Sequence, residues 1–174
     1  NWKNTPLHAR ARSRRSTVKT LLSLGADPHS RNYRGNTPLH CAADEHNTEN
    51  ARLLLASGAK ANAKNDDGLI PLELALRSCC NMNIEDMVKL SKVLLEAGSP
   101  RTERMKTFVE SIGTNFEFHR QAFDRKSVGR VSKALMELYE IFGVTPVAKR
   151  AVHDGKSKIL ITAKTWKKAH KELW

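Results

Sequence analysis

Apolar residues in the first part of the chain fall into short groups at three- and four-residue spacing, which predicts short helices joined by turns. The clearest group begins at Thr37, whose hydroxyl suits a helix N-cap, and continues with Pro38 at the first helical position, where an N–H is not needed. Residues 39–43 then present a narrow apolar face that lets another helix approach closely. Residues 52–56 supply that second helix, and Gly58 ends it because glycine tolerates the left-handed conformation.

The same helix–turn–helix unit occurs three times. Residues 5–8 (Thr-Pro-Leu-His) lie 32 positions before residues 37–40, and residues 70–73 (Ile-Pro-Leu-Glu) lie 33 positions after them. The Gly-Ala pair that closes the second helix also recurs after 33 positions, from 25–26 to 58–59. Tetrapeptide, Gly-Ala pair and period therefore agree on one repeating unit.

This period, with its Thr-Pro-Leu-His-x-Ala signature, resembles the ankyrin repeat over roughly residues 4–100. The resemblance implies a mainly α fold, an ankyrin-repeat solenoid of about three repeats, near residues 1–32, 33–65 and 66–100. Residues 101–174 lose the period and are predicted to form a helical C-terminal extension, truncated at the end of the given sequence.

The histidines of the tetrapeptide predict structural hydrogen bonds rather than catalysis. In ankyrin repeats this histidine bonds within and between repeats, and we interpret His8 and His40 in that way. In the third unit Glu73 replaces the histidine and Ile70 replaces the capping threonine, so the polar network there must differ.

The third unit is also longer than the second. From Glu73 to Gly98 there are 25 residues, against 18 between the equivalent positions of the second unit. The extra residues fall around 78–86, between the two helices, and we expect a loop there with the next helix beginning at Asn83 or Ile84.

The resemblance also places candidate binding residues. The segment between units, His29 to Asn36, is expected to project as a β-turn or hairpin finger in which Gly35 supplies a positive φ. By their place on fingers and first helices, the candidate partner-binding residues are Arg31, Tyr33, Arg34, Asn36, Asp44, Glu45, Lys64, Asp66, Asp67, Leu69 and Arg77.

Among these candidates, the adjacent Tyr33 and Arg34 form the preferred pair. A tyrosine offers rigid amphipathic area and an arginine a planar fork of donors, and both residue types are common in interface hot spots. Leu69 is expected to be exposed and to add an apolar contact. The alternative for each of these positions is that it only contacts the neighbouring finger.

Two apolar stripes at helical spacing come after the repeats. The stripe at 102–116 predicts a helix that caps the array and packs on the segment after it, and the stripe at 127–142 predicts a second helix stopped by Gly143. Residues 147–162 have the pattern of a small β-hairpin with Asp-Gly in its turn. A short basic helix starts at Thr165 and is expected to pack on the preceding helices rather than to bind a membrane or a partner.

The chain is basic, and the excess positive charge is uneven. Net charge is +12, of which residues 1–100 contribute +4 and residues 101–174 contribute +8. We interpret this excess as scattered, solvated surface charge, and the alternative is that the basic tail binds an acidic partner, nucleic acid or an anionic surface. No apolar run approaches the roughly 18 residues of a transmembrane helix.

The sequence offers no constellation for chemistry. It has no phosphate-binding glycine loop, no nucleophile elbow and no Cys/His set with metal-ligand spacing, so we predict no catalytic residue, metal or cofactor, and no enzyme. The three cysteines, at 41, 79 and 80, do not make a disulfide framework, and Cys41 is expected to be a buried thiol in a reducing cytosol.

The resemblance therefore implies a protein–protein interaction module, an adaptor or inhibitor that captures a partner protein through the concave face of fingers and inner helices. One alternative is nucleic-acid association through the basic C-terminal half. Another is that residues 101–174 begin an enzymatic domain continuing past Trp174, for which the repeats would be a targeting module. The expected location is cytoplasmic, or delivery into another cell as an effector.

Overall fold

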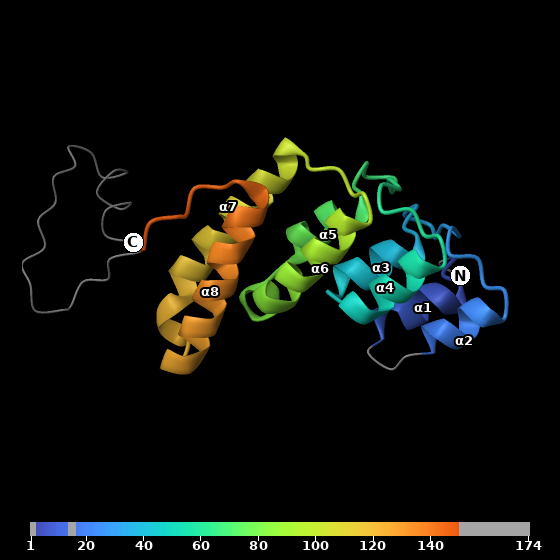
Figure 1. The fold of residues 1–174 in the computed structure, drawn as a ribbon, viewed down its shortest axis with the longest axis horizontal. Helices are drawn as coiled ribbons and strands as arrows, with labels where there is room; N and C mark the ends of the chain where they lie inside the picture. Colours follow the sequence, from blue (N-terminus) through green and yellow to red (C-terminus); the bar gives the residue numbers. More distant parts are fainter. Residues whose placement is uncertain (1–2, 14–16, 150–174) are drawn as a thin grey trace, which may run out of the picture.

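The computed structural model describes residues 3–13 and 17–149 (Figure 1). In this part of the chain every regular element is a helix. The α-helices are α1 (Pro6–Arg12), α2 (Val18–Ser23), α3 (Pro38–Asp44), α4 (Thr48–Ala56), α5 (Pro71–Ser78), α6 (Ile84–Glu96), α7 (Glu103–His119) and α8 (Arg125–Phe142), with 3-10 turns η1 (Asn81–Asn83) and η2 (Arg120–Ala122). None of the described helices is long and apolar enough to cross a membrane.

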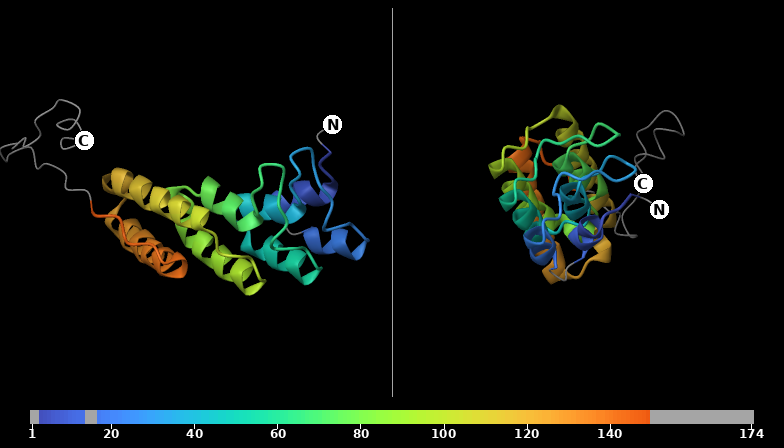
Figure 2. Two further views of the ribbon diagram at one scale, coloured as in Figure 1. Left: turned by 90° about the horizontal axis from the view of Figure 1, so that it is seen from above. Right: turned by 90° about the vertical axis from the view of Figure 1, so that its right-hand side faces the viewer.

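The helices stack as consecutive pairs in two rows. One row consists of α1, α3, α5 and α7, each packed on the next, and the other consists of α2, α4, α6 and α8 (Figure 2, left). The molecule is therefore elongated, with α1 and α2 at one end and α7 and α8 at the other (Figure 1). This arrangement confirms the predicted solenoid with additional C-terminal helices.

We call the row of α1, α3, α5 and α7 the inner row and its members the inner helices. Small side chains allow these helices to pack closely. Ala42 and Ala75 have no exposed surface and occupy equivalent positions of α3 and α5. Ala11 of α1 and Ala43 of α3, which also have no exposed surface, are equivalent to each other at the next position along the helix. Leu7, Leu39 and Leu72 are likewise almost fully buried at the start of the same helices. Burying one leucine side chain is worth about 1.5–3 kcal/mol, so each repeat adds a similar increment to one continuous core.

The tetrapeptide histidines tie each repeat to the next, as predicted. The backbone N–H of Thr37 donates to Nδ1 of His40 (3.1 Å), so the proton of the neutral ring lies on Nε2, which donates to the carbonyl of Leu69 (3.0 Å). His8 repeats this pattern with Thr5 (3.2 Å) and the carbonyl of Asn36 (2.9 Å). Both rings are buried, and burial lowers the pKa of each, to about 4 for His40.

Glu73 keeps the same position but changes the chemistry of the link. Its Oε2 accepts the backbone N–H of Ile70 (3.2 Å), and its Oε1 accepts the hydroxyl of Thr102 (2.7 Å). The residue before the 17-residue helix α7 is Thr102, so the carboxylate joins the third repeat to the C-terminal helices. The altered network that the sequence predicted is therefore a junction.

The lengthened third unit and the two C-terminal stripes lie where they were expected. The extra residues fall between α5 and α6, where η1 occupies part of the connection and α6 begins at Ile84. Helix α8 begins two residues earlier than predicted because the carboxylate of Asp124 accepts the N–H groups of Lys126 and Ser127. It ends at Gly143, which has a left-handed φ of 64°.

Helices α7 and α8 approach each other closely at a glycine. A side chain at Gly113 would place its Cβ 2.8 Å from Cζ of Tyr139, and closer still to the hydroxyl oxygen. The hydroxyl of Tyr139 also accepts the N–H of Val147 (3.4 Å) from the segment that leaves α8. The second aromatic stripe is therefore core, together with Phe116, which is fully buried.

Three sequence predictions are not tested by these residues. Residues 147–149 form no strand, and the rest of the predicted hairpin at 147–162 lies outside the described residues, as does the predicted helix from Thr165. The division of the chain near residue 100 into repeats and extension stays a prediction, although α7 and α8 continue the two rows.

Candidate functional site

Two loops project from one side of the solenoid before α3 and α5 (Figure 2, left), and they touch each other. We name residues 29–36 finger 1 and residues 62–69 finger 2. The N–H of Asp66 in finger 2 donates to the carbonyl of Arg34 in finger 1 (3.0 Å). Deeper down, the side-chain amide of Asn65 donates to Oδ1 of Asn36 (2.8 Å).

Arg31 links the two fingers through hydrogen bonds and an ion pair, a contact that we call the clasp. Its guanidinium donates to the carbonyl of Lys64 (2.9 Å) and pairs with Oδ1 of Asp66 (3.1 Å). Gly35 makes room for this contact, because a Cβ there would lie 2.7 Å from Cγ of Asp66 and closer to both ion-pairing groups. Its φ of 66° is a second reason for glycine at this position.

Tyr33 and Arg34 lie at the exposed part of finger 1. Tyr33 is 43% exposed, and the guanidinium carbon of Arg34 lies 5.4 Å from the centre of its ring. This is a cation–π arrangement that holds the guanidinium with its donor edges accessible. Across residues 3–13 and 17–149, neither Arg34 nor Lys64 takes part in an ion pair, whereas Arg31 does.

The remaining charged candidates lie at the C-terminal ends of α3 and α5, apart from Asp67, which lies in finger 2. Arg12 reaches from α1 to Asp44 (3.4 Å) and Glu45 (3.2 Å) at the end of α3. Arg77 of α5 lies 3.7 Å from Asp67 at the tip of finger 2. Pairs of this exposure contribute at most about 1 kcal/mol each, so their main effect is to fix side-chain positions and neutralise charge.

Two candidates are not surface residues, and the expectation that Leu69 is exposed was wrong. Leu69 is 3% exposed and Asn36 is 6% exposed. Both lie at the base of a finger, where their carbonyls accept the histidine hydrogen bonds of the preceding repeat. Their backbones must therefore be inside the stack, and the structure brings the other nine candidates to its surface.

The sequence analysis missed the residues that shape the fingers. Oδ1 of Asn32 accepts the N–H groups of Arg34 and Asn36 (both 3.0 Å), and Oδ1 of Asn65 accepts the N–H of Leu69 (2.9 Å). Both asparagines are buried. Their spacing of 33 residues was visible in the sequence and could have identified them.

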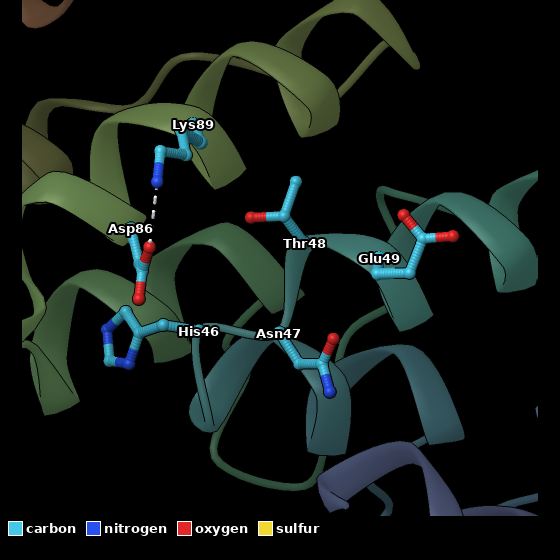
Figure 3. A pocket seen from close by; sticks show the side chains of 6 residues that line it. All are labelled: His46, Asn47, Thr48, Glu49, Asp86 and Lys89. Atoms are coloured by element: carbon cyan, nitrogen blue, oxygen red, sulfur yellow. Dashed lines mark hydrogen bonds and ion pairs between the residues drawn. The ribbon is translucent and has the colours of Figure 1, made fainter. Parts of the chain in front are cut away.

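A separate hollow of about 360 Å³ lies between the start of α4 and helix α6 (Figure 3). It is lined by His46, Asn47, Thr48, Glu49, Asp86 and Lys89, and Lys89 pairs with Asp86 (3.1 Å). Nε2 of His46 bonds to the carbonyl of Ala75 (3.0 Å), and burial lowers the pKa of this histidine. The ring is thus engaged in linking two repeats.

Two of the cysteines, Cys41 and Cys79, are thiols of low reactivity. Burial raises the pKa of Cys41, and it raises the pKa of Cys79 to about 12. Both are therefore protonated near neutral pH and poor nucleophiles. Among the described residues, no group of three His, Cys, Asp or Glu side chains is placed to hold a metal ion.

Comparison with known proteins agrees with this architecture. A family model described as ankyrin repeats (3 copies) matches residues 7–101. The chain is 41% identical over 87 residues to neurogenic locus notch homolog protein 4 of Homo sapiens, covering 49% of this chain and 4% of that protein.

Two further relatives are named as a regulatory subunit and as an ankyrin-repeat protein. The chain is 40% identical over 75 residues to protein phosphatase 1 regulatory subunit 27 of Mus musculus, covering 43% of this chain and 46% of that protein. It is 46% identical over 72 residues to ankyrin repeat and SOCS box protein 5 of Mus musculus, covering 41% and 22% respectively. The chain thus spans less than half the length of these relatives, and its stacked helix pairs, histidine links and repeat match place it in the ankyrin-repeat family.

Proposed function

We propose that this chain is a non-enzymatic adaptor or inhibitor that captures one partner protein through its two fingers and the adjoining ends of the inner helices. Ankyrin repeats are generally protein–protein interaction modules. One relative carries a printed name as a regulatory subunit of protein phosphatase 1, which is a statement about that protein and is consistent with a binding role here.

The observation that carries the proposal is the preformed contact between the fingers. Asp66, Arg31 and Asn65 join finger 1 to finger 2 through four hydrogen bonds of 2.8–3.1 Å. Because the loops are ordered before a partner arrives, binding does not have to supply the entropy of ordering them. Tyr33 and Arg34 are then presented on a rigid support, as hot-spot residues require.

The size of the surface suits a protein partner. Helix pairs packed about 10 Å apart give four pairs a strip on the order of 30–40 Å long. Such a strip can provide the roughly 800 Å² per side of a standard protein interface. We place the chain in the cytoplasm in this proposal because its three cysteines are free thiols, which persist in a reducing compartment.

The test is affinity capture from extracts of the native cell, with and without nuclease, comparing wild type with Tyr33→Ala/Arg34→Ala. The control is Lys133→Ala/Met136→Ala on α8, which removes an exposed cation and a 46% exposed apolar side chain far along the solenoid. We expect one protein that survives nuclease, is retained by the control and binds the finger variant at least tenfold more weakly. The proposal is overturned if the captured protein is lost on nuclease treatment, or if the finger variant captures it as well as the wild type does.

A further inference from the structure

We call the two fingers and the adjoining ends of α1, α3 and α5 the finger surface. Its acidic side chains all form ion pairs, whereas two basic side chains of the fingers form none with the described residues. Four of its carboxylates come from Asp44, Glu45, Asp66 and Asp67, and all four are within ion-pair distance of an arginine. The arginines that pair with them are Arg12, Arg31 and Arg77. The pairs join different repeats or different elements, so sequence neighbours do not reveal them.

Two basic side chains on the same surface, Arg34 and Lys64, form no ion pair with the described residues. Arg34 and Lys64 are exposed and lie on adjacent fingers, and the carbonyl of each accepts a hydrogen bond that joins the fingers. Neither has a carboxylate partner in the parts of the chain that the structure describes. The finger surface therefore has its negative charge neutralised and its positive charge available.

The sequence that leads into finger 1 is rich in basic residues. Residues 1–34 contain eight Lys or Arg residues, which include Arg34 itself and the ion-paired Arg12 and Arg31, and a single acidic residue, Asp27. Asp27 is engaged locally, because its Oδ1 accepts the N–H of His29 (2.9 Å). Positive potential of this kind speeds association with a negative surface and disfavours positively charged partners.

We propose that the partner segment which the fingers recognise is acidic, an Asp- or Glu-rich stretch of protein, with Arg34 and Lys64 as the residues that read its charge. This inference rests on the proposed function. The guanidinium of Arg34, oriented over Tyr33, offers parallel N–H donors that match one carboxylate, and Lys64 offers a second point of charge on the next finger.

The arrangement favours a protein carboxylate over a nucleic acid. A polyanionic backbone carries regularly spaced charge and binds by neutralising many phosphates at once. On the fingers, however, the two available cations alternate with the ion-paired carboxylates of Asp66 and Asp67, so they do not form the extended row of cations that a phosphate backbone neutralises. Isolated carboxylates on a partner can meet Arg34 and Lys64 one at a time.

The experiment is selection of a random-peptide phage library on the full chain, followed by fluorescence polarisation with the enriched peptides. The test variant is Arg34→Glu/Lys64→Glu, and the matched control is Lys126→Glu/Lys133→Glu on α8, which changes net charge equally at exposed positions. We expect enriched peptides of negative net charge, with affinity reduced at least tenfold by the finger variant and less than twofold by the control. Circular dichroism establishes that both variants are folded.

Three outcomes overturn the inference. Enriched peptides that are neutral or basic, yet lost on Tyr33→Ala/Arg34→Ala, leave the finger surface as the binding site and refute only its preference for acidic segments. Acidic peptides weakened equally by both charge reversals reveal general attraction to a basic chain. A single-stranded oligonucleotide that binds more tightly than the peptides, and is lost in the finger variant alone, replaces protein by nucleic acid.

Discussion

Replacing Gly35 by alanine tests whether the contact between the fingers contributes to the free energy of unfolding. The same replacement at Gly68 is the control. Gly68 occupies the equivalent place in finger 2, with a φ of 71° against 66° for Gly35. A Cβ at Gly68 meets nothing within 4 Å, whereas a Cβ at Gly35 runs into Asp66 and Arg31. The two substitutions thus impose a similar backbone change, and only one of them disturbs the clasp.

The expected magnitudes follow from this difference. An alanine in the left-handed region costs roughly 1–2 kcal/mol, which both variants should lose. Gly35→Ala should lose about 1 kcal/mol more, because Arg31 and Asp66 must move apart and an exposed ion pair with one charge-assisted hydrogen bond is worth about that much. Both side chains are about half exposed or more (49% and 62%), so they can swing away without disrupting the core.

The assay is urea unfolding followed by circular dichroism, with a second probe to establish that the transition is two-state, as repeat arrays sometimes are not. A double-mutant cycle with Asp66→Asn should show coupling to Gly35→Ala and none to Gly68→Ala. If the two glycine variants agree within about 0.3 kcal/mol, the Arg31–Asp66 contact contributes nothing measurable, and its part in the preorganisation of the fingers is refuted.

Three further predictions concern the stack itself. Gly113→Ala should destabilise the chain by about 2 kcal/mol or more, because α7 and α8 must separate at this point. Gly129→Ala, whose Cβ meets nothing, should stabilise the chain by up to about 1 kcal/mol. Thermal unfolding measures both effects, and equal effects would contradict the close packing of Gly113 on Tyr139. Because the pKa of His40 falls from 6.5 to about 4 on folding, the unfolded chain binds the proton first, and unfolding free energy should drop by roughly 3 kcal/mol as pH falls across that window. A His40→Gln variant should show a shallower pH slope, and an unchanged slope would assign the effect to other groups. Glu73→Gln and Thr102→Val should be non-additive by about 0.5 kcal/mol or more in unfolding free energy, and simple additivity would show that their 2.7 Å hydrogen bond does not join the repeats to α7.

Much of the fold could be predicted because its signals are local. A capping threonine, a proline at the first helical position and a terminal glycine act on their own helix, so the starts of α3 and α5 and the end of α4 were predicted near their observed positions. Helix α4, however, begins at Thr48, four residues before the predicted start, because the side chain of Asn47 caps it. The predicted start of α8 is two residues late because its apolar stripe begins only after the polar turn that Asp124 caps. The candidate site was predicted less well, since position in a repeat identified the fingers but not which side chains are exposed.

The sequence by itself determined the repeating unit, its period of about 33 residues and the helices that carry it. Only the tertiary structure decided that Leu69 is buried, that Arg31 pairs with Asp66, and that Arg34 has no carboxylate partner within residues 3–13 and 17–149. The physical reason is distance along the chain. Propensity and capping act within one turn of a helix, whereas burial and ion pairing on the fingers depend on groups brought together across a whole repeat by stacking.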